Sequence, residues 1–144
     1  MLDALMTLIP RKTRVRAGWK LLRGADPSLR AYSDIFVEPY PIWTDWRSGL
    51  GDSSFVLYSI VRAVKPRVIV ETGTSRGKST CAMALACKQN GGGHIHTIDP
   101  HTQNAWAHDG CEDSLTFINR RLREYQLQDR CTVHVGTSAE IAAT

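Results

Sequence analysis

Residues 68–80 constrain the fold of this chain more than any other stretch. They read V-I-V-E-T-G-T-S-R-G-K-S-T. The β-branched run Val68–Val70 predicts a short strand that is covered on both faces. Gly73 and Gly77 follow, and glycine allows the backbone to turn sharply and to approach a ligand closely. Residues 78–88 are then expected to form a helix, and this strand–turn–helix order is typical of nucleotide-type sites in open α/β sheets.

A phosphate-binding loop is the first hypothesis for the turn. Its motif, G-x-x-x-x-G-K-[ST], places four residues between two glycines. Gly77, Lys78 and Ser79 match the second half, but Thr72 occupies the position of the first glycine. Gly73 comes one residue too late for the loop to wrap a phosphate with successive N–H groups. A degenerate phosphate loop that uses Lys78 and Ser79 remains an alternative.

A second pattern, E-x-G-x-x-x-G-x-S, fits the turn without a gap. It is formed by Glu71, Gly73, Gly77 and Ser79. A carboxylate at the end of the strand repels a triphosphate, but it accepts hydrogen bonds from an ammonium group or a hydroxyl. This pattern therefore favours a ligand that carries such groups.

Two further strands are predicted downstream, at residues 94–98 (H-I-H-T-I) and 131–135 (C-T-V-H-V). Asp99 follows the first of them, roughly 20 residues after the glycine turn, where an acid suits ribose hydroxyls. The second runs into G-T-S-A-E, in which Ser138 is expected to cap a helix. Ligands in such sheets bind beyond the carboxyl ends of the strands. We predict the strand order 3-2-1 with helices on both faces.

The series V-E-T-G-T-S-R-G-K-S-T, H-T-I-D-P and D-R-C-T-V-H-V-G-T-S-A-E resembles the class I S-adenosylmethionine (SAM) dependent methyltransferases, in particular their small-molecule O-methyltransferase branch. The resemblance covers about residues 65–142. It implies a Rossmann-like open parallel sheet with SAM as the cofactor. It also implies methyl transfer from the sulfonium to a hydroxyl of a small-molecule or sugar-type acceptor.

The resemblance assigns roles to individual residues. Glu71 would meet the methionine amino group or the ribose, and Asp99 would hold the ribose hydroxyls. Ser79 would lie near the carboxylate end of the cofactor. The candidate cofactor-binding residues are Glu71, Gly73, Thr74, Ser75, Gly77, Ser79, Asp99, Pro100, His101, Gly136, Ser138 and Ala139, the last two beside the adenine. No catalytic residue and no metal ligand is assigned.

A class I sheet has seven strands, and this sequence predicts three. We therefore expect residues 52–144 to form the N-terminal half of a SAM-binding domain, with the C-terminal strands missing. The catalytic base, most of the acceptor pocket and any divalent metal would belong to the missing part. The remaining alternative is a non-catalytic fragment that keeps half of the cofactor site, since three strands with an exposed edge are marginal alone.

Residues 1–51 are expected to form a basic and aromatic extension. Its first 25 residues carry a net charge of +5, against +4 for the whole chain, so the rest of the chain is nearly neutral and gives no sign of a nucleic-acid partner. The basic segment would either lie on an anionic membrane surface or form a helical lead-in with a solvated face. Five aromatic residues follow it: Tyr32, Phe36, Tyr40, Trp43 and Trp46.

The remaining features indicate a cytoplasmic protein. Hydrophobic residues make up 42% and charged residues 22% of the chain, as in ordinary soluble folds. The four cysteines form no C-x-x-C pair, so reduced thiols are expected. Further helices are predicted at residues 53–64 and 114–125. Arg76 and Lys78, beside the glycine turn, are expected to face solvent.

Overall fold

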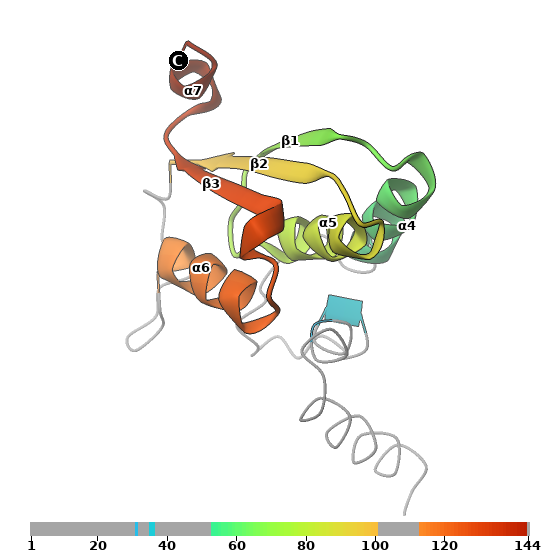
Figure 1. The fold of residues 1–144 in the computed structure, drawn as a ribbon. Coiled ribbons are helices and arrows are strands. Elements are labelled where there is room, and N and C mark those ends of the chain that lie inside the picture. The colour runs from blue at the N-terminus through green and yellow to red at the C-terminus, as the bar shows by residue number, and fades with distance from the viewer. Residues whose placement is uncertain (1–30, 32–34, 37–52, 101–112, 144) are drawn as a thin grey trace, which may run out of the picture.

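The computed structural model describes residues 31, 35–36, 53–100 and 113–143 (Figure 1). Every helix and strand predicted in this part of the chain is present, with bounds that agree to within two residues. In chain order the elements are α4 (Ser53–Val64), β1 (Val68–Thr72), α5 (Lys78–Gln89), β2 (His94–Asp99), α6 (Ser114–Glu124), the 3-10 turn η2 (Gln128–Arg130), β3 (Cys131–Val135) and α7 (Ser138–Ala142).

The three strands form one parallel sheet in the order β1-β2-β3, which confirms the predicted order. Val70 pairs with His96, and His96 pairs with Thr132 on the third strand. Each strand reaches the next through a helical crossover, as parallel neighbours require. All three carboxyl ends therefore lie at the same edge of the sheet.

Helices α4, α5 and α6 lie on one side of this sheet (Figure 1). Helix α5 is the centre of the core, because every residue from Lys78 to Cys87 is buried. Its alanine, serine and cysteine side chains are small, so the helix packs closely beneath the strands. Helices were predicted on both faces of the sheet, but the helices of the described residues cover only this face.

The prediction that β1 is covered on both faces is wrong. Val68 is 59% exposed and Val70 is 64% exposed, because both side chains point away from the described helices. Alternate residues on β1 face inward, and Ile69 packs against the core. The V-I-V run therefore forms a strand with one uncovered face.

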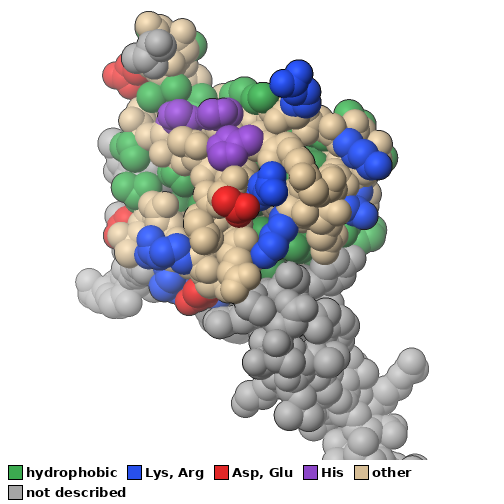
Figure 2. Space-filling view, in the orientation of Figure 1, with side chains coloured by type: hydrophobic (Ala, Val, Ile, Leu, Met, Phe, Trp, Pro, Cys, Tyr) green, Lys and Arg blue, Asp and Glu red, His purple; other side chains and the backbone are tan. Residues whose placement is uncertain are grey.

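Histidines occupy the same uncovered face. His94, His96 and His134 are the three histidines of the described residues, and Figure 2 shows them as one group. Nδ1 of His96 lies 3.0 Å from Nε2 of His134, and Nε2 of His94 lies 2.8 Å from the Thr132 hydroxyl. The outer face of the sheet thus combines valines with hydrogen-bonded imidazoles.

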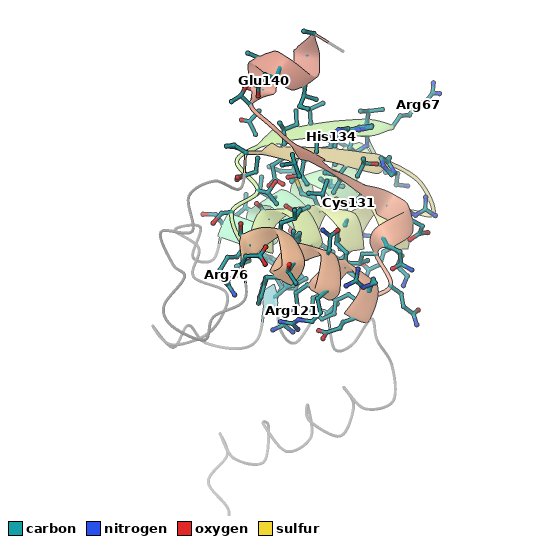
Figure 3. The ribbon with its side chains drawn as sticks, turned by 90° about the vertical axis from the view of Figure 1, so that its left-hand side faces the viewer. Arg67, Arg76, Arg121, Cys131, His134 and Glu140 are labelled. Carbon is teal, nitrogen blue, oxygen red and sulfur yellow. The ribbon has the colours of Figure 1, made fainter. Side chains whose placement is uncertain are left out.

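The thiols of Cys81, Cys87 and Cys131 are free and buried, as the sequence predicts for these three. Figure 3 shows Cys131 at the sheet, on the strand that also carries His134. Burial raises the pKa of the Cys131 thiol to about 12. Such thiols are chemically inert at neutral pH, because almost none is ionised.

The predicted extension, residues 1–51, lies almost entirely outside the described residues. Of its aromatic side chains only Phe36 is described, and its ring contacts those of Phe55 and Tyr58 at centroid distances of 5.7 and 5.2 Å. Of the described helices, none is long and apolar enough to cross a membrane.

Candidate functional site at the carboxyl ends of the strands

The turns after the three strands are joined by backbone hydrogen bonds. The Gly73 N–H, just beyond β1, donates to the Ile98 carbonyl at 2.8 Å. The Gly136 N–H, just beyond β3, donates to the Asp99 carbonyl at 3.2 Å. The residues predicted to bind the cofactor from the first, second and third strands therefore come together at one edge of the sheet.

The two glycines of the turn serve different purposes. Both have positive φ angles, 86° at Gly73 and 77° at Gly77, which L-residues adopt only with strain. A Cβ atom on Gly77 would lie 2.0 Å from Cδ1 of Ile118, whereas a Cβ on Gly73 would meet no atom within 4 Å. Gly77 thus allows α6 to pack against the turn, and Gly73 leaves open space above the backbone.

Asp99 contacts the glycine turn directly. Its Oδ2 accepts a hydrogen bond of 2.9 Å from the Ser75 N–H. Ser75 itself has a φ of 48°, so the carboxylate supports a strained part of the turn. The acid that the sequence predicts for ribose binding therefore also orders the loop beside it.

Glu71 is held by three hydroxyl groups, which we call the hydroxyl cage: those of Ser79, Thr80 and Thr97. Ser79 donates to Oε1, and Thr80 and Thr97 both donate to Oε2, Thr97 at 2.7 Å. Thr80 and Thr97 were not predicted from the sequence. The alternation of side chains along a strand could have indicated Thr97, because it lies two residues from the apolar Ile95 and therefore shares its buried face.

Arg76 and Lys78 are 5% and 6% exposed, so the prediction that they face solvent is wrong. The guanidinium carbon of Arg76 lies 4.0 Å from the centroid of the Phe117 ring, within reach of a cation–π interaction. Figure 3 places Arg76 beside α6, the helix that carries Phe117. Contact with α6 removes Arg76 from water, and Lys78 becomes the first residue of the buried helix α5.

The third turn differs from its prediction in one detail. The N-cap of α7 is Thr137 instead of Ser138, because Thr137 and Glu140 form a capping box. Ser138 and Ala139 stand in the first helical turn and are exposed. Pro100 is exposed beside Asp99, and His101 lies outside the described residues.

Residues 70–144 match a family model described as a methyltransferase domain. The chain belongs to this family. Together with the fold, the match confirms the resemblance to class I SAM-dependent methyltransferases. A comparison with curated proteins finds no match.

Solved structures of methyltransferases share the fold. A methyltransferase from Geobacter sulfurreducens is 21% identical with a TM-score of 0.51, and the match covers 98% of this chain and 57% of that one. The O-methyltransferase TomG from Streptomyces achromogenes, involved in tomaymycin synthesis and solved with SAM, is 19% identical with a TM-score of 0.53. That match covers 81% of this chain and 44% of TomG. The chain thus spans about half the length of these methyltransferases.

The residues at this edge fit the cofactor of the methyltransferase family. SAM presents an ammonium group and ribose hydroxyls, which are hydrogen-bond donors, and the edge presents the carboxylates of Glu71 and Asp99. The space above Gly73 is open to a ligand, since a Cβ there would touch nothing. The described residues at this edge thus provide carboxylate acceptors and open space of the kind that SAM requires.

Proposed function

We propose that this chain binds SAM at the carboxyl edge of its sheet and contributes the cofactor half-site to an O-methyltransferase. The acceptor would be a hydroxyl of a small molecule or a sugar-type compound. The observation that carries the proposal is the convergence of Glu71, the glycine turn and Asp99 at one edge. SAM supplies an electrophilic methyl group, and the protein's share of such chemistry is largely alignment of donor and acceptor.

In this proposal Asp99 accepts hydrogen bonds from the ribose hydroxyls. Its Oδ2 already accepts from Ser75, so the carboxylate is held in place before a ligand arrives. Gly73 lets the cofactor approach the backbone. Ser138 and Ala139, exposed at the start of α7, are proposed to border the adenine.

The proposal is tested by titrating the full chain with S-adenosylhomocysteine in a calorimeter. Asp99→Asn is the sharpest variant, because the amide oxygen still accepts from Ser75 while the charge is lost. We expect binding at least about tenfold weaker, since a hydrogen bond to a charged group contributes about 1.5–3 kcal/mol. Asp129→Asn is the matched control, because its side chain is 61% exposed on η2.

The same titrations separate the alternatives. Binding of magnesium-ATP that is lost in Lys78→Ala, with no binding of S-adenosylhomocysteine, would contradict the proposal and favour a degenerate phosphate loop. A chain that binds neither ligand would be a non-catalytic fragment.

A further inference from the structure

The hydroxyl cage limits what Glu71 can offer to a ligand. An ionised carboxylate has about four lone-pair positions, two on each oxygen. Thr80 and Thr97 occupy both positions of Oε2, and Ser79 occupies one of Oε1. About one acceptor position is left, so most of the hydrogen-bonding capacity of Glu71 serves the protein itself.

Thr97 connects the cage to the glycine turn. It is fully buried on β2, directly opposite Glu71 in the sheet register. Its hydroxyl also lies 2.5 Å from that of Thr74, which is 2% exposed at the start of the turn. Thr97 has a single hydroxyl proton, and it goes to Glu71. Thr74 must therefore be the donor to Thr97, which gives a directed chain from Thr74 through Thr97 to Glu71.

This series of hydrogen bonds holds the glycine turn in place from the buried side of the sheet. The carbonyl of Thr74 accepts the Gly77 N–H at 2.7 Å, so the position of Thr74 sets the closure of the turn. Successive hydrogen bonds in a buried network polarise and strengthen one another. A turn that is already ordered loses less conformational freedom when it binds a ligand.

We propose that Thr97 is a positioning residue for the cofactor turn, acting through Glu71 and Thr74 without touching the cofactor. The identity of the ligand rests on the proposed function, whereas the ordering of the turn does not. Thr97→Val keeps the shape of the side chain and removes the hydroxyl, so Glu71 loses one donor and Thr74 loses its acceptor. Thr97→Ser restores the hydroxyl and lacks only a methyl group.

The first test is amide hydrogen exchange of the full chain without ligand. In Thr97→Val, peptides that cover residues 72–78 should exchange about tenfold faster, while β3 and α6 keep the wild-type rates. Thr97→Ser should return the turn to within about twofold of wild type. Thr132→Val is the matched control, since it deletes the same hydroxyl from the outer face and should leave the turn unchanged.

The second test is the affinity for S-adenosylhomocysteine, which should fall about tenfold in Thr97→Val and recover in Thr97→Ser. Wild-type exchange in the turn of Thr97→Val, or exchange raised evenly along the whole chain, would overturn the proposal. If Thr97→Val does not fold, Thr74→Val must loosen the same turn. Failure of the wild-type chain to bind the ligand counts against the proposed function alone, because the exchange result stands without it.

Discussion

Gly77 is the position where a single added methyl group should do the most damage to the site. In Gly77→Ala the backbone must keep a φ of 77°, which costs about 1–2 kcal/mol for an L-residue. The new Cβ would also lie 2.0 Å from Cδ1 and 2.8 Å from Cγ1 of Ile118, which is fully buried. Overpacking of this kind costs about 1–3 kcal/mol. The total loss of unfolding free energy is therefore about 2–5 kcal/mol.

Thermal unfolding followed by circular dichroism measures this loss. A chain of this size loses about 3–4 °C per kcal/mol, so the midpoint should fall by about 6–20 °C. Gly73→Ala is the matched control, because its φ is also positive but its Cβ meets nothing within 4 Å. That variant should lose only the backbone term of about 1–2 kcal/mol.

A double variant separates strain from collision. Ile118→Val removes Cδ1, the atom nearest to the new methyl group, so Gly77→Ala should cost at least about 1 kcal/mol less in that background. Equal losses in Gly73→Ala and Gly77→Ala, together with additive effects in the double variant, would refute the packing argument.

Two further predictions concern titration and thiol chemistry. The pKa of Asp113 is lowered by its hydrogen bonds with Thr116, and that of Glu140 by hydrogen bonds from Thr137. The stabilising effect of both carboxylates is therefore present above their unfolded-state pKa values of about 4. It is lost as the pH falls through their lower folded-state pKa values. Urea midpoints measured between pH 6 and pH 3 should decrease, and a midpoint that rises on acidification would contradict this. With a pKa of about 12, roughly one Cys131 thiol in 10,000 is ionised at pH 8, so alkylation followed by mass spectrometry should label it only after unfolding. Rapid labelling of Cys131 in the native chain would show that the thiol is accessible.

The elements and their order could be predicted because their signals are local. Lys65-Pro66 ends the first described helix, the three glycines at 91–93 separate α5 from β2, and the polar caps mark where helices begin. The glycine spacing and the acid after β2 likewise predicted which residues would meet at the edge of the sheet. All of these signals lie within a few residues of the features that they determine.

The features that were missed or predicted wrongly depend on residues far away in the chain. Arg76 is buried because it packs against Phe117 of α6, and no sequence pattern near Arg76 predicts that contact. Gly77 is needed for Ile118 as well as for the turn, which only the packed structure shows. The V-I-V run has the same composition whether one face of its strand is covered or both. Local sequence thus determines the segments, and their burial depends on which segments meet.

Glu71 and the hydroxyl groups that donate to it are close in sequence, and this affects the order in which the parts of the sheet can fold. Glu71 and its donors Ser79, Thr80 and Thr97 all belong to the unit formed by β1, α5 and β2. Short loops close at low entropic cost, so these contacts can form as soon as β2 pairs with β1 and before β3 is added. During synthesis from the N-terminus, the glycine turn is therefore expected to be ordered while the third strand is still being made. The unit formed by β1, α5 and β2 would then serve as the template onto which β3 assembles.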